Sequence, residues 1–316
     1  MIADMRINLG IQAALACVAL GIASCGASKD VMPLMGENTA ESNEKGEALF
    51  QQAKARDEAG NSRRAIRDYD RVATRHPFAP SAPEARFRQA ELLHERGDIV
   101  KAFEAYQQLI ERYSGSGLYA RALTRQAEMA QSAADGEVRS GFLGLRTRLS
   151  LDRTVEMLEK VRDNAPQSAT AAKAQFTVGQ LYESRNRPAE AVAAYRKLVR
   201  DQPSASQSPD ALFQTGEILL AQADSGNRNQ ATLDLAREAF NDYLIQYPSH
   251  AKAGEARRKV REIRDRNLQR TFDTAAFYQR TGQTEAAKVY YREVIKETKS
   301  GELHDAARAR LRALGE

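Results

Sequence analysis

Few residues in this chain of 316 stand in the arrangements that catalytic or metal-binding sites require. The four histidines, His76, His94, His250 and His304, do not have the spacing of metal ligands. The sequence contains no glycine-rich phosphate loop and no Gly-x-Ser-x-Gly nucleophile elbow. Its net charge of +5 is too dilute for a nucleic-acid surface. We therefore predict that the protein is not an enzyme, holds no metal or cofactor, and does not bind nucleic acid.

One cysteine stands where a covalent modification is expected. Residues 7–22 are apolar, follow Arg6, and end in Ile22-Ala23-Ser24-Cys25, a layout typical of a bacterial secretory signal. The last four residues resemble a lipobox, so we predict a lipoprotein signal peptide over residues 1–24, starting at Met1 or Met5, and lipidation with palmitate at Cys25. Acyl chains on this cysteine would anchor the protein to a membrane. The alternative is a buried apolar helix with an inert thiol.

The segment after Cys25 predicts a tether. Residues 26–43 have no sustained hydrophobic period and contain Gly, Pro, Ser and Asn, so we assign residues 25–43 to a lipidated tether. Cys17 would leave with the signal peptide, and the single remaining cysteine allows no intrachain disulfide. Gly26 stands where inner-membrane lipoproteins of enterobacteria have an aspartate. This resemblance favours the periplasmic face of the outer membrane.

The rest of the chain, residues 44–316, is built from a repeat. The segment that ends at Pro77 and the one that ends at Pro203 share a pattern of small and aromatic residues. The matching positions are Ala53, Gly60, Ala65 and Tyr69 in the first and Gly179, Asn186, Ala191 and Tyr195 in the second. Small residues let two helices pack closely, and Gly or Asn accepts the positive φ of a turn. The pattern resembles the tetratricopeptide repeat of about 34 residues. We predict an all-α solenoid of about six helix pairs with a C-terminal capping helix.

Such a solenoid has a groove lined by the first helices of its pairs. The residues predicted to face a bound peptide there are Phe50, Lys54, Phe87, Glu91, His94 and Arg121, followed farther along by Lys173 and Gln180. Two alternatives stay open at this point. A phenylalanine that recurs in every unit also suits core packing, and a face of mixed charge also suits plain solvation.

Two segments depart from the simple repeat. Residues 140–154 lie in an insertion in the third unit and contain Gly141 and Gly144, which predict a loop or a broken helix, either functional or tucked onto the array. Residues 257–270 are rich in arginine, with acidic residues interspersed. They predict either a solvated helix that joins repeats or a docking surface for an acidic partner.

The lipobox, tether and repeats together resemble the outer-membrane assembly lipoproteins of the BamD kind. His76-Pro77-Phe78-Ala79-Pro80-Ser81-Ala82 is similar to the Tyr-Pro-Phe-Ser-Pro-Tyr-Ala of that family. Residues 239–297 are also similar, above all Phe277-Tyr278-Gln279-Arg280-Thr281-Gly282. The middle of the chain departs from the family, because its units and insertions make it longer.

The resemblance implies a scaffold that helps to insert β-barrel proteins into the outer membrane. Its first units would receive unfolded barrel precursors near Phe50, Phe87 and Arg121. Its last units would hold a POTRA domain of the barrel-forming insertase near Arg280 and Arg292. The alternative is a tetratricopeptide lipoprotein that coordinates cell-wall synthesis with envelope constriction.

Overall fold

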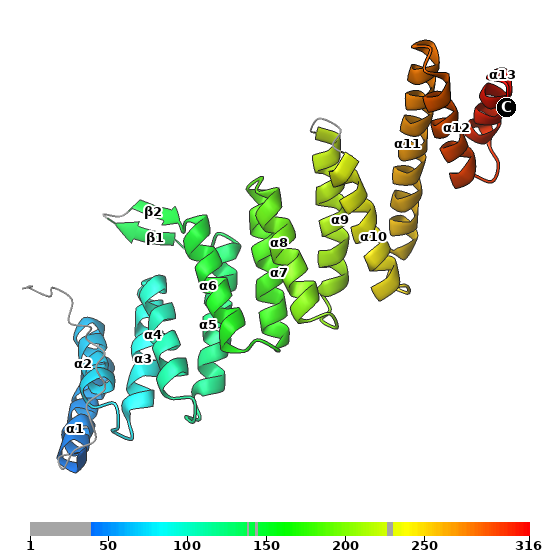
Figure 1. Ribbon diagram of the computed structural model, residues 1–316. Coiled ribbons are helices and arrows are strands. Elements are labelled where there is room, and N and C mark those ends of the chain that lie inside the picture. Colours follow the sequence, from blue (N-terminus) through cyan, green and yellow to red (C-terminus); the bar gives the residue numbers. More distant parts are fainter. Residues whose placement is uncertain (1–38, 138, 143–144, 226–229) are drawn as a thin grey trace, which may run out of the picture.

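The computed structural model describes residues 39–137, 139–142, 145–225 and 230–316, which form a row of stacked helices (Figure 1). The predicted signal peptide, Cys25 and most of the predicted tether lie outside these residues. In the described part, the helices are α1 (Thr39–Glu58), α2 (Ser62–Arg75), α3 (Ala82–Glu95), α4 (Ile99–Arg112), α5 (Tyr119–Ala134), α6 (Leu151–Asn164), α7 (Ala169–Ser184), α8 (Pro188–Asp201), α9 (Ser208–Ser225), α10 (Gln230–Gln246), α11 (Ala253–Arg280), α12 (Thr284–Glu297) and α13 (Glu302–Ala313). No helix of this part is long and apolar enough to cross a membrane.

Consecutive helices pair along the row, from α1 with α2 to α11 with α12, and α13 packs on the last pair. This confirms the predicted solenoid of six helix pairs with a final helix. The first helix begins at Thr39, so the predicted tether boundary at residue 43 is too late by five residues. The first five residues of α1, Thr39-Ala-Glu-Ser-Asn, lack a sustained apolar period, so the sequence did not mark them as helical. They nevertheless form the first turn of α1.

The turns within the pairs use the residues that the repeat predicted. Gly60, between α1 and α2, has φ +73°, and Asn186, between α7 and α8, has φ +54°. Side chains with a Cβ rarely adopt this left-handed conformation, whereas glycine adopts it freely and asparagine tolerates it. The chain therefore reverses within a few residues at each of these points.

The recurring phenylalanines pack inside their own units. In five of the six units, a phenylalanine of the first helix contacts an aromatic ring of the second helix, at centroid distances of 5.4–5.7 Å. The pairs are Phe50–Tyr69, Phe87–Tyr106, Phe176–Tyr195, Phe213–Phe240 and Phe272–Tyr291. Gly179 makes room for one of them, because a Cβ there would lie 2.4 Å from Cε1 of Tyr195. The phenylalanine ladder is thus core packing, the plainer of the two alternatives.

The buried apolar side chains form separate clusters along the row. Helix α11 belongs to two of them: Ala253, Ala256 and Ile263 pack with the α9–α10 cluster, and Ala275 packs with α12 and α13. Most of the arginines between these contact points are exposed. The arginine-rich stretch is therefore part of one continuous helix of 28 residues that joins two units.

The insertion in the third unit is neither a loop nor a broken helix. Strands β1 (Arg139–Phe142) and β2 (Leu145–Arg148) pair antiparallel, with Arg139 opposite Arg148 and Phe142 opposite Leu145. This hairpin lies between α5 and α6 and projects from the helical row (Figure 1). The prediction was wrong because its two glycines were taken to break a helix, whereas Gly141 lies within a strand and is paired with Arg146.

Candidate functional site

Helices α1, α3 and α5 enclose a hollow of about 430 Å³ in the groove of the first units. It is lined by Phe50, Lys54, Asp57, Glu58, Tyr69, Glu84, Phe87, Arg88, Glu91, Leu118 and Arg121, which we call the groove pocket. Five of the six residues predicted to contact a peptide are among them. His94 is exposed and does not line it. Helices from three successive units thus bring together residues that are more than 70 positions apart in the sequence.

The floor of the groove pocket is aromatic. Phe50 and Phe87 line it although they are only 6% and 4% exposed, so each offers the pocket only a small part of its ring. The guanidinium carbon of Arg121 lies 4.6 Å from the centroid of the Phe87 ring, a cation–π contact. The arginine therefore covers the apolar floor at one side while its charge stays exposed.

Sequence reasoning missed the ionic network of this pocket, which is centred on Arg88. Its Nε and Nη2 donate to Asp57 at 2.7 and 3.3 Å, and its Nη1 donates to Glu91 and Glu95, each at 3.1 Å. The hydrogen bonds to Asp57 are the largest cause of a raised pKa at Arg88. Part of this network could have been predicted, because Arg88, Glu91 and Glu95 are spaced i, i+3 and i+7 and so lie on one face of a helix. The contact with Asp57 depends on how two units stack.

Lys54 and Arg121 are the cations of this pocket that a ligand can reach. Both are exposed, and neither makes an ion pair with any residue in the described part of the chain. Exposed Glu58 and Glu84 line the same hollow. The walls can therefore pair with either charge, and the floor accepts small apolar groups.

Two buried tyrosines next to the groove stay neutral over a wide pH range. Burial raises the pKa of Tyr69 to about 12, and the negative charge of Asp57 adds to this. Burial also raises the pKa of Tyr106 to about 12, followed by the charge of Glu91. The phenol of Tyr69 donates a long hydrogen bond of 3.5 Å to Asp57. These rings act as fixed, uncharged packing partners for Phe50 and Phe87.

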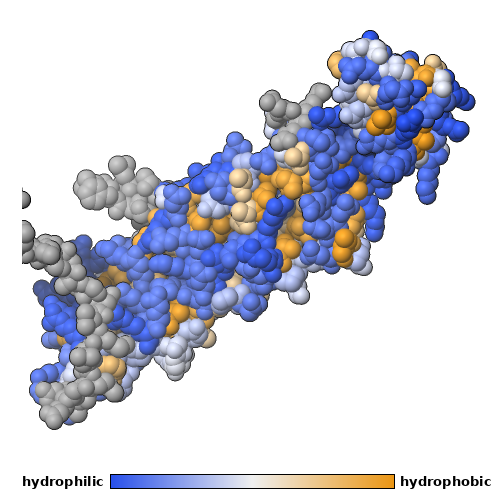
Figure 2. Space-filling model, viewed as in Figure 1, coloured by the Kyte–Doolittle hydropathy of each residue, from blue (hydrophilic) through white to orange (hydrophobic). Residues whose placement is uncertain are grey.

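A second hollow of about 570 Å³ lies farther along the same groove, between α5, α6 and α7. Leu158, Val161 and Ala174 give it apolar walls, and the predicted Lys173 lines it. Gln180 is exposed and is not part of it. On the face shown in Figure 2, apolar side chains gather in separate patches among hydrophilic ones. The hollow between α5, α6 and α7 thus adds an apolar contact point to the groove.

The last units present a different surface. Arg280 is exposed at the end of α11, but Arg292 is held by Glu316 through bonds of 2.6 Å from Nε and 2.5 Å from Nη2. Phe277 and Val289 are 52% and 56% exposed, which is unusual for large apolar side chains. Beside them the rings of Tyr278 and Tyr290 stack at 5.4 Å. The sequence predicted the two arginines as contacts and missed these two exposed apolar residues.

Within the described residues, no group of three or more His, Cys, Asp and Glu side chains is placed to hold a metal ion.

Comparisons with known proteins agree with this architecture. A tetratricopeptide-repeat family model matches residues 50–117, and the YfiO family model, described as an outer membrane lipoprotein, matches residues 147–312. None of the curated proteins compared with the chain matches it.

Several solved structures are similar at low identity. Pseudomonas aeruginosa pilF is 12% identical, with 87% of this chain and 100% of that one covered and a TM-score of 0.29. The C-terminal part of a repeat protein from Cytophaga hutchinsonii is 12% identical, covering 85% and 94%, with a TM-score of 0.34. MamA from Desulfovibrio magneticus RS-1 is 15% identical, covering 69% and 99%, with a TM-score of 0.29. These scores add nothing on function. The YfiO match spans more than half of the chain, and the chain belongs to this family of outer membrane lipoproteins.

Proposed function

We propose that the protein is a non-catalytic scaffold of the β-barrel assembly machinery, anchored by lipid at Cys25 to the periplasmic face of the outer membrane. In this proposal the first units bind unfolded barrel precursors and the last units bind a POTRA domain of the insertase. Membership of the YfiO family supports the general role. The observation that carries it is the groove pocket, where Lys54, Phe87 and Arg121 come together from three helices.

The composition of the groove pocket suits a segment of an unfolded barrel strand. Such a segment alternates apolar and polar side chains, because one side faces lipid and the other faces the barrel interior. The apolar side chains would lie against Phe50 and Phe87. The polar ones would meet Lys54, Glu84 and Arg121 at the walls. Walls of both signs accept many sequences, as a scaffold for diverse precursors requires.

The surface of the last units suits a folded domain. Phe277 is an exposed apolar side chain of the kind that forms the centre of protein interfaces, Arg280 follows it by three positions on α11, and Val289 is a second exposed apolar side chain on α12. Arg292 would contribute as a pair with Glu316 instead of as a free charge. The POTRA contact proposed from the sequence at Arg280 and Arg292 is therefore extended here to Phe277 and Val289.

The precursor-binding role is tested with the chain beginning at residue 26 and a fluorescein-labelled peptide that copies one strand of an outer-membrane β-barrel. We expect Lys54→Glu with Arg121→Glu to weaken binding by about tenfold in fluorescence anisotropy, because both reachable cations of the groove pocket are reversed. The matched control is Arg64→Glu with Arg75→Glu, which reverses two exposed charges on α2 outside this pocket. Equal losses in the two double variants would contradict the role of the groove pocket.

The partner-binding role is tested by titrating a soluble POTRA fragment. Phe277→Ser with Arg280→Glu should weaken the complex by about tenfold, since it removes an exposed apolar contact and reverses its neighbouring charge. Arg292→Gln should have a smaller effect, because this arginine is already paired. If the unaltered protein binds no POTRA fragment, the assembly role fails and the cell-wall alternative takes its place.

The anchor is tested with Cys25→Ala, which should move the protein from the membrane fraction to the soluble or unprocessed fraction. Processing at the same bond with continued membrane attachment would contradict lipidation at this cysteine.

A further inference from the structure

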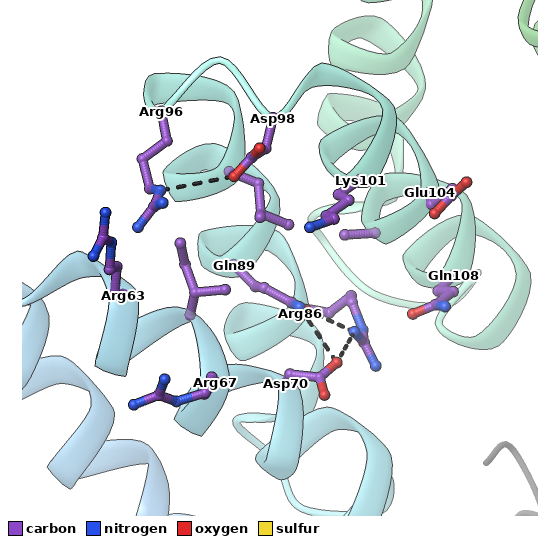
Figure 3. Close-up of a pocket in the computed structure, with 13 residues that line it drawn as sticks. Arg63, Arg67, Asp70, Arg86, Gln89, Arg96, Asp98, Lys101, Glu104 and Gln108 are labelled. Atoms are coloured by element: carbon purple, nitrogen blue, oxygen red, sulfur yellow. Dashed lines mark hydrogen bonds and ion pairs between the residues drawn. The ribbon is translucent and has the colours of Figure 1, made fainter. Parts of the chain in front are cut away.

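A third hollow lies on the other side of α3 from the groove pocket. Its volume is about 390 Å³, and it is bounded by α2 and α4 with α3 between them; we call it the outer pocket (Figure 3). Helix α3 turns Phe87 and Glu91 toward the groove and Arg86 and Gln89 toward the outer pocket. The two hollows therefore share helices α2 and α3 but no lining residue.

Arg86 in the wall of the outer pocket is buried, and two of its three guanidinium nitrogens, Nε and Nη2, make no hydrogen bond within the described part of the chain. It is 2% exposed, and its Nη1 donates to Oδ1 of Asp70 at 2.8 Å and to Oε1 of Gln89 at 2.6 Å. Its Nε and Nη2 are also buried, and no residue in the described part of the chain accepts a hydrogen bond from them. A buried charged donor without an acceptor costs free energy, so this edge of the guanidinium is expected to receive an acceptor from outside.

The geometry of the unpaired edge selects the acceptor. Nε and Nη2 lie along one edge of the planar guanidinium group. The N–H bond of Nε and one N–H bond of Nη2 point in the same direction from this edge. A carboxylate or phosphate group accepts from both at once, through two of its oxygens. One neutral carbonyl oxygen would satisfy the edge poorly.

The charges around the outer pocket favour an anion as well. Each of its acids already faces a cation: Asp70 pairs with Arg86, Asp98 with Arg96 at 3.7 Å, and Glu104 with Arg153 at 2.5 Å. The exposed cations Arg63, Arg67 and Lys101 have no ion pair with any described residue. Figure 3 shows the two arginines on one side of the hollow and the lysine on the other. The net charge available to a ligand is positive.

The rest of the lining distinguishes a peptide from a small ion. Ile66, Leu93 and Ala105 form apolar parts of the wall, and Gln108 adds an amide that can bond a peptide backbone. The volume far exceeds what one carboxylate group occupies. A ligand that fills the hollow must therefore bring apolar atoms together with its negative charge.

We propose that the outer pocket is a docking site for an acidic segment of a partner protein. One Asp or Glu carboxylate of that segment accepts hydrogen bonds from Nε and Nη2 of Arg86, while neighbouring acids face Arg63, Arg67 and Lys101. This inference goes beyond the proposed function, because it concerns a surface on the opposite side of α3 from the precursor groove.

The first test uses two fluorescein-labelled peptides that differ only in having Glu or Gln at every acidic position, between leucines and serines. The protein should bind the Glu peptide about tenfold more tightly in anisotropy at low salt. Arg63→Glu with Arg67→Glu should abolish this preference. Arg64→Glu with Arg75→Glu reverses the same number of charges on the same helix but does not touch the outer pocket, so it should change affinity by less than about twofold. Equal losses in both variants, or no preference in the unaltered protein, overturn the proposal.

The second test isolates the buried guanidinium. Arg86→Lys keeps the charge but removes the two-pronged edge, so Glu-peptide affinity should fall by about fivefold or more in a protein that still melts cooperatively. If this variant does not fold, the exposed double variants still decide. Inorganic phosphate and phosphatidylglycerol vesicles serve as competing probes. Binding of either with the same dependence on Arg63 and Arg67, without a preference for the Glu peptide, would overturn the assignment to a protein segment.

The proposed function and this inference can fail separately. Lys54→Glu with Arg121→Glu should impair binding of the strand peptide and leave the Glu peptide unaffected, and Arg63→Glu with Arg67→Glu should do the reverse. If both pairs impaired both ligands, the two pockets would not be distinct sites.

Discussion

At the scale of single residues, Gly179 shows how closely the two helices of a unit approach. A Cβ at this position would lie 2.4 Å from Cε1 and 2.6 Å from Cδ1 of Tyr195. We expect Gly179→Ala to lower the free energy of unfolding by about 1–3 kcal/mol, because the buried ring has to shift. Urea denaturation followed by circular dichroism measures the change.

Gly254 provides the control for this substitution. It also lies in a helix, α11, but a Cβ there would meet nothing within 4 Å. Gly254→Ala should therefore leave stability unchanged or raise it slightly, since alanine favours helix. A loss in Gly254→Ala equal to that in Gly179→Ala would show that the ring contact is not the cause.

The buried tyrosines predict a loss of stability in alkali. The pKa of Tyr106 is raised by burial to about 12, whereas a tyrosine in the unfolded chain ionises near 10. The folded protein thus holds a proton that the unfolded chain releases, so stability is complete below pH 10 and falls as the pH rises toward 12. Tyr106→Phe should reduce this fall in melting temperature between pH 9 and 11. A fall as steep as in the unaltered protein would mean that Tyr106 does not contribute.

Single residues also show the limit of prediction from sequence. Lys54, Phe87, Glu91 and Arg121 could be assigned to one groove because the repeat fixes which face of each first helix points there. The ion pair of Arg292 could not be predicted, because its partner Glu316 is 24 positions away, after the end of α13. A periodic pattern predicts the face of a helix, whereas an ion pair depends on how two elements end beside each other.

At the scale of elements, two serines at helix starts differ in what they do. Ser168 caps α7 by accepting a hydrogen bond of 3.0 Å from the backbone N–H of Ala171. Ser81 stands at the start of α3, but its buried hydroxyl has no partner among the described residues. Ser168→Ala should cost about 1 kcal/mol of stability, and Ser81→Ala should cost nothing or gain a little. Thermal melting of both variants checks this, and equal shifts would contradict the capping role.

The elements that sequence reasoning predicted best are those set by the repeat. Ala65 and Ala191 mark equivalent second helices, and Gly60 and Asn186 mark the turns before them, because tight packing and positive φ restrict which residues fit. The hairpin of β1 and β2 escaped this reasoning. Strands of four residues are too short for an alternating pattern to distinguish them from a loop. Gly141 is compatible with a turn, a loop or a strand, so it did not decide between them.

At the scale of the whole molecule, the stacked clusters predict unfolding in parts. Leu311 is 7% exposed and packs in the cluster formed by α12, α13 and the end of α11. Leu311→Ala should destabilise this cluster by about 2–5 kcal/mol, since a buried side chain leaves a cavity. In a solenoid each unit contacts only its neighbours, so the first units should be unaffected.

Hydrogen exchange followed by mass spectrometry tests this prediction. Amides of α12 and α13 should exchange faster in Leu311→Ala, while those of α3 and α4 keep their protection. Ala313→Ser, a substitution in the same helix at a residue that is not counted in the buried cluster, is the control. Faster exchange throughout the chain would show that the molecule unfolds as a single unit.

Helix α11 has a mechanical consequence for the ends of this row. With 28 residues it is about 42 Å long, and it supplies side chains to two successive cores without an intervening turn. A hinge needs a few residues that absorb a change in backbone angle, and a continuous helix provides none. A load applied to α12 and α13 is therefore transmitted as a tilt of α9 and α10. The protein would therefore keep a fixed distance between partners that are bound to the units on either side of α11.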